Sequence, residues 1–299
     1  MLTNFDQLVD RAKAFSKKKT VVVAGAHDSH ALEAVLKARE DGTIDCALVG
    51  KKEEILSIAN DIGYETDSMN IINADTDQDS SFRAVALIRE EKGDILMKGN
   101  IDTNTLLKEV VSKETGIGKG GIMSHMCILQ IPTYKKIVGF TDAGMVLYPN
   151  LDQKAGILNN ALDLFRELGY EEPKVSVVSA VEVINPKIPD TLDGAEIKKM
   201  GEANKFGRCC IEGPISFDIS FSRESAEIKG FESPVAGDVD IMLVPDITVG
   251  NILAKALYCL GGAKMVGCVL GAKVPIVLSS RSATFEEKYY SLMLCAALK

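Results

Sequence analysis

A serine and an arginine stand side by side where an apolar run ends near the C-terminus, in Leu278-Ser279-Ser280-Arg281-Ser282. We expect a helix to follow, and in open α/β sheets the carboxyl ends of strands face the ligand crevice. A guanidinium flanked by hydroxyl groups and by the amides of a helix start can bind an oxyanion such as phosphate. The alternative is structural: Ser282 caps the helix and Arg281 pairs with Glu286 or Glu287.

Five further clusters that combine polar residues with glycine or proline also follow apolar runs. Each of these clusters taken alone can be explained by helix capping or by turn formation. Six such clusters in one chain indicate instead a long crevice lined by the ends of strands. The five are Met97–Asn100 with Thr103, Thr105 and Lys108 on the next helix, Phe140–Gly144, Glu182–Lys187, Gly213–Asp218 and Pro245–Asn251.

Familiar cofactor and metal motifs are missing from the sequence. No G-x-G-x-x-G follows the first strand, Gly116–Gly121 holds its lysine in the wrong place for a P-loop, and no G-x-S-x-G elbow occurs. H-x-x-x-H, C-x-x-C and D-x-D-x-D-G are also missing, so we expect no metal site. His27 and His30 are expected at a helix cap or on the surface, and His125 as a hydrogen-bonded core residue.

Composition indicates an ordinary globular protein, with 299 residues of which 46% are hydrophobic and 25% charged. The net charge of −8 disfavours nucleic acid as a partner. No run approaches the roughly 18 apolar residues that span a bilayer, and the acidic first ten residues resemble neither a signal nor a transit peptide. Seven scattered cysteines are expected to be reduced packing residues, which predicts a cytoplasmic protein.

The elements that must position these clusters alternate between strand and helix. Short β-branched runs alternate with amphipathic stretches, which is typical of a parallel sheet with helical crossovers. We expect strands at 20–24, 47–49, 71–72, 95–97, 122–131, 136–141, 174–178, 239–244, 265–270 and 276–278. We expect helices at 30–40, 53–62, 82–91, 152–168, 250–260 and 285–297, and a long loop-rich stretch over 182–215, which contains several prolines and glycines.

The predicted fold class is α/β, with two doubly wound α/β/α domains. The first domain is expected to contain residues 1–138 and, by return of the C-terminal strands and helix, residues 269–299. The second domain is expected to contain residues 139–268.

Taken together, the clusters resemble the phosphate acetyltransferase and phosphate butyryltransferase family, and the butyryl branch is the closer match. Six segments that carry the resemblance occur in the family's order over essentially the whole chain. Two positions depart from the family's patterns: Lys108 stands where arginine is usual, and Glu287 stands where acetyl enzymes have a catalytic aspartate. The six segments are KGNIDTNTLLK (98–108), FTDAGMVLYPN (140–150), SAVEVINPKIPDTLDGA (179–195), EGPISFD (212–218), SPVAGDVDIMLVPDITVGN (233–251) and VPIVLSSRSAT (274–284).

The resemblance implies reversible acyl transfer from acyl-CoA to inorganic phosphate, giving an acyl phosphate and free CoA. The acyl group is expected to be butyryl or a branched relative, with CoA as a substrate and no separate cofactor. The resemblance also implies a fold similar to isocitrate and isopropylmalate dehydrogenases, with the site in an interdomain cleft, and a homodimer or higher homo-oligomer. Ser280 and Arg281 match the family's catalytic serine and phosphate-binding arginine.

The chemistry requires a base when a thiol attacks an acyl phosphate. A free thiol is only about 3% thiolate at neutral pH, so deprotonation costs about 2 kcal/mol. A positioned base contributes about 10²–10⁴-fold, and we expect Glu287, or less favourably Asp142, to supply it. Ser280 would donate to the developing oxyanion. Because both substrates are anions, we expect a locally basic pocket, with substrate-binding residues Lys98, Gly99, Thr103, Lys108, Asn185, Lys187, Gly250 and Asn251.

Three other functions remain open from the sequence. A phosphate acetyltransferase would share the fold and the reaction type. An NAD(P)-dependent hydroxy-acid dehydrogenase could use the same fold without Rossmann glycines, although the sequence offers no metal-binding aspartate set for it. A non-catalytic binding protein could also retain the fold.

Overall fold

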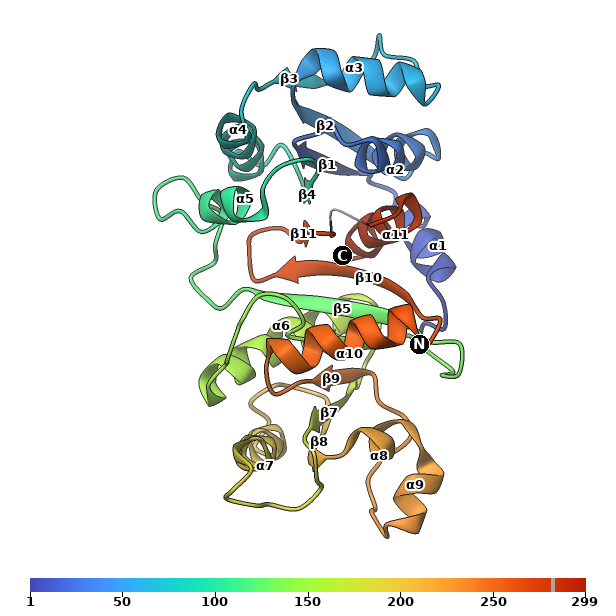
Figure 1. Ribbon diagram of the computed structural model, residues 1–299, viewed down its shortest axis with the longest axis vertical. Helices are drawn as coiled ribbons and strands as arrows, with labels where there is room; N and C mark the ends of the chain where they lie inside the picture. The colour runs from blue at the N-terminus through green and yellow to red at the C-terminus, as the bar shows by residue number, and fades with distance from the viewer. Residues whose placement is uncertain (281–282) are drawn as a thin grey trace. The chain divides into compact units, whose positions relative to one another are not determined.

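The computed structural model describes residues 1–280 and 283–299. Its chain divides into two compact units. The N-terminal unit contains Asp6–Gly121 and Val266–Leu298, and the central unit contains Met1–Phe5, Ile122–Met265 and Lys299 (Figure 1). These divisions fall at 121/122 and 265/266, whereas the sequence-based boundaries were placed at 138/139 and 268/269. Among the described helices, none combines the length and apolar character that crossing a bilayer requires.

The N-terminal unit contains a sheet in which β1 lies between β2 and β4. The strand order is β3-β2-β1-β4-β11-β10, and all neighbours are parallel except β10 and β11. The strands are β1 (Lys19–Ala24), β2 (Ile44–Gly50), β3 (Ile71–Asn73), β4 (Ile95–Lys98), β10 (Lys264–Leu270, of which 266–270 belong to this unit) and β11 (Ile276–Val277). The helices are α1 (Asp6–Lys13), α2 (Ser29–Glu40), α3 (Lys52–Asp61), α4 (Asp77–Arg89), α5 (Thr103–Val110) and α11 (Phe285–Ala296).

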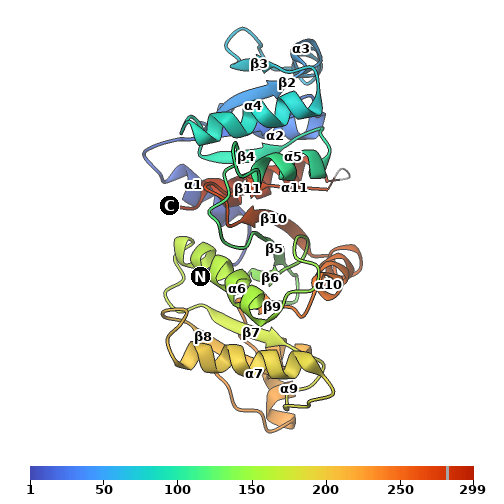
Figure 2. The ribbon, with the colours of Figure 1, turned by 90° about the vertical axis from the view of Figure 1, so that its left-hand side faces the viewer.

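Helices cover both faces of this sheet. Figures 1 and 2 show α4 and α5 on one face, with α2, α3 and α11 on the other. The strands are apolar on both sides as a result; Val21 to Ala24 of β1 are all fully buried. This arrangement confirms the predicted doubly wound α/β architecture, and the predicted strands at 20–24, 47–49, 71–72 and 95–97 all fall on observed strands.

The strands of the central unit follow one another in the order β5-β6-β9-β7-β8. β5 and β6 form an antiparallel pair, and the remaining neighbours are parallel. The strands are β5 (Ser124–Gln130), β6 (Val138–Thr141), β7 (Lys174–Val178), β8 (Cys210–Ile215) and β9 (Ile241–Leu243). The helices are α6 (Leu151–Glu167), α7 (Pro189–Glu202), α8 (Phe217–Phe221), α9 (Arg223–Ile228) and α10 (Ile247–Cys259).

The stretch 182–215 is not the long loop that the sequence predicted. It contains α7 and the edge strand β8. Pro189 opens α7, where a proline needs no intrahelical hydrogen bond. Gly194 lets α7 pack directly on β8, because a Cβ there would lie 3.0 Å from the Cα of Pro214. Proline and glycine therefore serve a helix start and a close helix–strand contact here, rather than turns.

Buried charges join the strands of the central unit near their amino ends. Lys136, with a side chain only 2% exposed, lies 3.0 Å from a carboxylate oxygen of Asp238 and 2.6 Å from one of Asp240. Burial raises the pKa of Asp238, but hydrogen bonds from Lys174, Lys135 and Lys136 outweigh it, so the net pKa lies below the usual value. Because these residues flank the starts of β6, β7 and β9, the cluster holds the sheet at the edge opposite the strand ends.

The contact between α7 and β8 predicts a loss of stability for Gly194→Ala. Alanine in a helix interior ordinarily gains about 0.5–1 kcal/mol over glycine, but the added methyl group would press on the Pro214 backbone. We expect a net loss of about 1–3 kcal/mol, measured as a lower Tm by circular dichroism. Gly118→Ala is the control, since a Cβ there meets nothing within 4 Å. A Tm for Gly194→Ala at or above that of the parent would contradict the packing argument.

Candidate functional site

Two of the predicted clusters meet at one edge of the N-terminal unit. β4 pairs in parallel with β1 on one side, where Lys98 lies opposite Ala24, and with β11 on the other, where Met97 lies opposite Val277. The three strands therefore end at the same edge of the sheet. The residues that follow them, among them Gly99 and Ser280, leave the sheet at this common edge. β1 is flanked by β2 and β4, the kind of switch point at which open α/β sheets bind ligands.

Main-chain atoms approach each other closely at this edge. The amides of Gly99 and Asn100 donate to the carbonyls of Ala24 and Gly25, each at 2.8 Å. A Cβ on Gly99 would lie 2.2 Å from the Gly25 oxygen, so only glycine fits there. Lys98 is 4% exposed, and its Nζ donates to the Gly99 carbonyl at 3.2 Å. The edge thus holds a buried positive charge beneath tightly packed backbone.

Three helices begin at the same edge. The side chains of Asp28, Asp102 and Thr284 cap α2, α5 and α11 by accepting hydrogen bonds from backbone amides. Helix N-termini carry partial positive charge, and together with Lys98 they favour an anion at this edge. Thr103 opens α5 and so belongs to the edge, whereas Lys108 lies exposed in the last turn, about 7.5 Å further along the helix axis.

The segment between β11 and α11 contains the predicted catalytic pair. Ser280 is exposed, and its carbonyl accepts a hydrogen bond from the Ala283 amide at 3.1 Å. Arg281 and Ser282 lie outside the described residues. The cap of α11 is Thr284 rather than Ser282, which was the structural alternative considered from the sequence. A threonine followed three residues later by glutamate is the signature of a capping box.

Glu287 completes that capping box. Its Oε2 accepts a hydrogen bond from the Thr284 amide at 2.7 Å, and its own amide donates to Thr284 Oγ1 at 3.3 Å. Within the described part of the chain, no hydrogen bond is recorded for its other oxygen, Oε1. The predicted base is therefore held at the start of α11 with one oxygen committed to the helix.

In the central unit, Asp142 follows β6 and is 2% exposed. Its Oδ1 accepts hydrogen bonds from the amides of Gly144 and Met145, each at 2.7 Å, and its Oδ2 accepts one from the His125 amide at 3.0 Å. Both oxygens are thus engaged by the backbone. The Asp142 carboxylate folds the 142–145 turn and ties it to β5.

His125 lies beside this turn and differs from the hydrogen-bonded core residue expected from the sequence. Its backbone is paired with Asp142 and Thr141, but no partner for its buried Nδ1 lies among the described residues. Burial lowers the pKa of His125 below its ordinary value, and the Asp142 charge opposes this only partly. The imidazole is therefore neutral at pH 7.

The other predicted residues of the central unit divide into two groups. Gly250 and Asn251 lie against the 142–145 turn: a Cβ on Gly250 would be 2.5 Å from the Asp142 carbonyl, and Asn251 Nδ2 donates to the Ala143 carbonyl at 3.3 Å. Asn185 and Lys187 lie on the loop after β7. Asn185 Oδ1 accepts the Lys187 amide at 3.0 Å, so this side chain shapes its own loop, and the Lys187 side chain is exposed.

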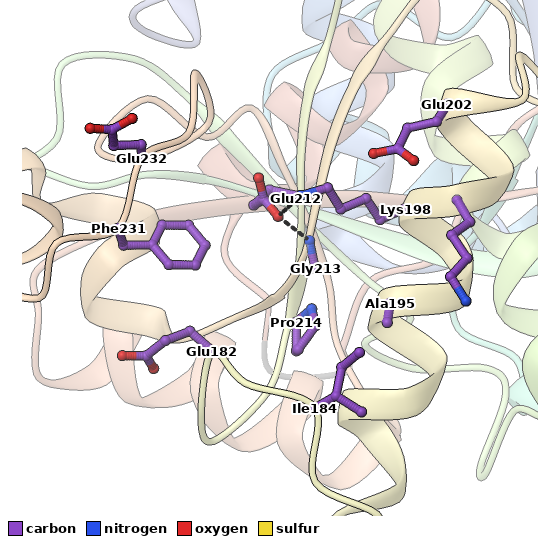
Figure 3. Close-up of a pocket in the computed structure, with 11 residues that line it drawn as sticks. Glu182, Ile184, Ala195, Lys198, Glu202, Glu212, Gly213, Pro214, Phe231 and Glu232 are labelled. Atoms are coloured by element: carbon purple, nitrogen blue, oxygen red, sulfur yellow. Dashed lines mark hydrogen bonds and ion pairs between the residues drawn. The ribbon is translucent and has the colours of Figure 1, made fainter.

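A pocket of about 360 Å³ opens between α7 and the edge strand β8 (Figure 3). Its buried carboxylate, Glu212, accepts hydrogen bonds from Lys198 Nζ at 2.7 Å and from the Gly213 amide at 3.1 Å. Glu182, Ile184 and Phe231 form part of the lining. Two of the predicted crevice clusters, 182–187 and 213–218, contribute to this lining, but none of the residues predicted individually as catalytic or substrate-binding does.

An ion pair joins the starts of α2 and α11 in the N-terminal unit. The sequence analysis did not predict it. Lys288 Nζ lies 3.0 Å from Asp28 Oδ2, and the Lys288 side chain is buried. Lys288 follows two glutamates in the first turn of the C-terminal helix, so nothing in the sequence marks it as buried, and a buried lysine requires a partner. Its partner is 260 positions away in the sequence, so only the fold identifies it.

Comparison with known proteins agrees with the sequence resemblance. The family model described as "Phosphate acetyl/butaryl transferase" matches residues 4–83 and 76–296. Over 99% of this chain and 98% of the relative, the chain is 38% identical to a phosphate butyryltransferase from Clostridium acetobutylicum. It is also 37% identical to a phosphate acetyltransferase from Thermotoga maritima, over 97% of this chain and 98% of that protein.

Solved structures show the same relationship. A branched-chain phosphotransacylase from Enterococcus faecalis superimposes with a TM-score of 0.83 at 32% identity, over 93% of this chain and 98% of that one. A 4-hydroxythreonine-4-phosphate dehydrogenase from Klebsiella pneumoniae reaches a TM-score of 0.55 at 13% identity, over 94% of this chain and 100% of that one. The second match concerns the fold alone, which is dehydrogenase-like. By sequence and by structure, the chain belongs to the phosphate acetyltransferase and phosphate butyryltransferase family.

Proposed function

We propose that this protein is a phosphate acyltransferase that moves a short acyl group reversibly between CoA and inorganic phosphate. The observation that carries the proposal is the shared edge of β1, β4 and β11, where buried Lys98, Gly99 and the Ser280 segment meet three helix N-termini. Such an edge favours a small oxyanion. The names of the relatives, phosphate butyryltransferase and phosphate acetyltransferase, supply the reaction class.

The proposed reaction needs two anions held in line. In the direction of acyl phosphate synthesis, a phosphate oxygen attacks the thioester carbonyl, the C–S bond breaks, and CoA leaves as a thiolate that takes up a proton. Ser280 is proposed to donate to the oxyanion that forms on the carbonyl, and Arg281 to hold the phosphate. Positioning both substrates supplies much of the remaining rate. In the reverse direction, a base removes the thiol proton.

The hydrogen bonds of the two candidate bases favour Glu287 over Asp142. Both oxygens of Asp142 accept backbone hydrogen bonds, so proton transfer to this carboxylate would disrupt the turn that it folds. Glu287 uses Oε2 for its cap and can receive a proton on Oε1. We therefore assign the base to Glu287 and a structural role to Asp142.

The remaining candidates are proposed to bind the substrates. At the shared edge of the N-terminal unit, Lys98, Gly99 and Thr103 would contact the acceptor phosphate or the thioester. Lys108, one helical turn and a half away, suits a more distant phosphate of CoA as a point charge. In the central unit, Asn185, Lys187, Gly250 and Asn251 are proposed as substrate-binding residues. CoA is a substrate in this scheme, and no further cofactor is proposed.

The decisive assay measures thiol release from butyryl-CoA with and without inorganic phosphate. We expect release only when phosphate is present, and a kcat/KM that is higher for butyryl- or isobutyryl-CoA than for acetyl-CoA. One methylene contributes only about 1–3 kcal/mol to such discrimination. A preference for acetyl-CoA would make the protein a phosphate acetyltransferase. Absence of phosphate-dependent release would contradict the proposed function, and turnover of NAD(P) with hydroxy acids would replace it with a dehydrogenase.

Amide substitutions distinguish the proposed roles of the Glu287 and Asp142 carboxylates. Glu287→Gln keeps an oxygen that can cap the Thr284 amide, so the Tm should stay near that of the parent, while kcat falls by about 10²–10⁴-fold. Asp142→Asn replaces one of two acceptor oxygens by a donor. It should lower stability by about 1–3 kcal/mol because the His125 amide loses its acceptor. If Glu287→Gln retains the parent's kcat, the base is not Glu287.

We propose in addition that the protein is a homodimer, with the exposed face of α10 as its interface. Figure 1 shows α10 lying across the strands of the central unit. The helix has one charged residue, Lys255, and its outer face is apolar at Val249, Ile252, Ala256, Cys259 and Leu260. Ile252 is 63% exposed and Leu260 89%. Contiguous exposed apolar surface of this kind is typical of protein–protein interfaces.

Light scattering coupled to size-exclusion chromatography tests this interface. We expect the parent to elute as a dimer and Ile252→Glu as a monomer, because a charge buried in an apolar interface is left without a partner. Ile228→Glu is the matched control, since Ile228 is a similarly exposed isoleucine at the end of α9. A parent that is monomeric at micromolar concentration would contradict the proposed dimer. An Ile252→Glu variant that stays dimeric would show that α10 is not the interface.

A further inference from the structure

The pocket between α7 and β8 carries the wrong charge for the proposed substrates. Four glutamates and two lysines are among the described residues that line it, so the lining has an excess of negative charge. Phosphate and CoA are anions, and a concave surface of this sign repels them. A ligand of the opposite charge is favoured instead. The glutamates are Glu182, Glu202, Glu212 and Glu232, and the lysines are Lys198 and Lys199.

Glu212 is the buried carboxylate of this lining, and one of its oxygens faces the pocket. The residue is 7% exposed. Its Oε1 accepts hydrogen bonds both from Lys198 Nζ at 2.7 Å and from the Gly213 amide at 3.1 Å, and Figure 3 shows the other oxygen pointing away from these two donors. Within the described chain, no hydrogen bond to Oε2 is recorded. Each carboxylate oxygen can accept about two hydrogen bonds, so Oε2 offers an enclosed acceptor to a molecule in the pocket.

Two further carboxylates stand at the rim of the pocket. Glu202, on α7, and Glu232, in the segment after α9, are both exposed, and no ion pair is recorded for either within the part of the chain that the structure describes. Figure 3 shows them on opposite sides of Glu212. The uncompensated charge of the pocket is therefore negative and lies at its rim. The other charged side chains of the lining are paired: Lys198 with Glu212, Glu182 with Lys229 at 3.4 Å, and Lys199 with Glu196 at 3.2 Å.

The rest of the lining is apolar. Besides Gly213, it consists of the side chains of Phe231, Pro214, Ile184 and Ala195. Such groups gain free energy by burying a hydrocarbon chain, and the face of an aromatic ring attracts an ammonium group within about 6 Å. The volume of about 360 Å³ lies near the lower end of the range for small-molecule sites, so a short ligand fits.

We propose that this pocket binds a small organic amine. The ammonium group donates to Glu212 Oε2, and the hydrocarbon chain lies against Phe231 and Pro214. In a diamine, the second ammonium group pairs with the rim carboxylates, Glu202 and Glu232. An ammonium group has three donors and no acceptor, so it suits a lining whose available groups are carboxylate oxygens. The site is separate from the proposed catalytic and substrate-binding residues, none of which lines it.

Isothermal titration of the full chain with 1,4-diaminobutane tests the site, with neither acyl-CoA nor phosphate present. A salt concentration of 0.15 M screens attraction between exposed charges beyond about 8 Å, so diffuse attraction to an acidic protein is suppressed. We expect one molecule to bind per chain. The uncharged 1,4-butanediol has the same carbon chain and should not bind. Equal binding of the diol would overturn the recognition of an ammonium group, and a diamine that does not bind would overturn the whole proposal.

Glu212→Gln tests the buried contact. Glutamine removes the negative charge and keeps an oxygen that can accept from the Gly213 amide. The Kd for 1,4-diaminobutane should rise about tenfold or more, because a charge-assisted hydrogen bond is replaced by a neutral one. Glu224→Gln is the matched control and should leave the Kd unchanged, since Glu224 is an exposed glutamate of α9 outside the pocket lining. A folded Glu212→Gln variant with the parent's Kd would overturn the proposal.

The rim gives a second comparison that leaves the buried ion pair intact. Glu202→Gln combined with Glu232→Gln changes only exposed side chains, so the Tm should stay at the parent value. The Kd for 1,4-diaminobutane should rise about two- to fivefold more than the Kd for butylamine, which has no second ammonium group. If Glu212→Gln does not fold, this comparison decides. An unchanged Kd for the diamine would then overturn the proposal.

These outcomes are independent of the proposed acyl transfer. The titrations contain no substrate, so amine binding is measured whether or not the chain releases thiol from butyryl-CoA. A chain that binds the diamine but shows no phosphate-dependent thiol release would contradict the proposed function and support the amine site. A chain that is active but does not bind the diamine would contradict the amine site and leave the proposed function intact.

Discussion

The parallel pairing of β4 with both β1 and β11 is the constraint on which the candidate site of the N-terminal unit depends. Parallel strands end at one edge, and each following helix begins there, so three segments distant in sequence are brought together by backbone hydrogen bonds alone. The contact between Gly99 and the Gly25 carbonyl tightens this edge, because no side chain separates the two chains. A buried lysine and three helix starts then give it the positive potential that an anion requires.

Carboxylates near the strand ends are used mainly to hold backbone. Asp142 binds three amides, and Asp28 and Asp102 cap helices. Glu287 caps α11 with one oxygen. In a protein with an excess of acidic residues, engaging carboxylates with backbone donors limits their repulsion of anionic substrates. Glu287 differs from Asp142 in that, among the described residues, only one of its carboxylate oxygens accepts a backbone hydrogen bond.

The strand–helix alternation and the clusters at strand ends were predictable because period, apolar runs and turn residues are local signals. They placed Lys98, Gly99 and Ser280 directly after strands, and the structure ends those strands at one edge. The helix α7 and strand β8 were not predictable, because the proline and glycines that suggested a loop serve a helix start and a close packing contact. The engagement of Asp142 and the pairing of Lys288 with Asp28 were also beyond the sequence. Both depend on atoms that only the folded backbone brings within reach.

The buried charges around Lys136 lie at the amino ends of the strands of the central unit, opposite the ends at which the polar clusters follow. They tie the beginnings of β6, β7 and β9 together through Asp238 and Asp240, away from the turns that follow those strands. The ionic anchor and the turns after the strands thus lie at different ends of the same strands. Evolution can then alter the turns at one end while the ionic cluster at the other end keeps the scaffold intact.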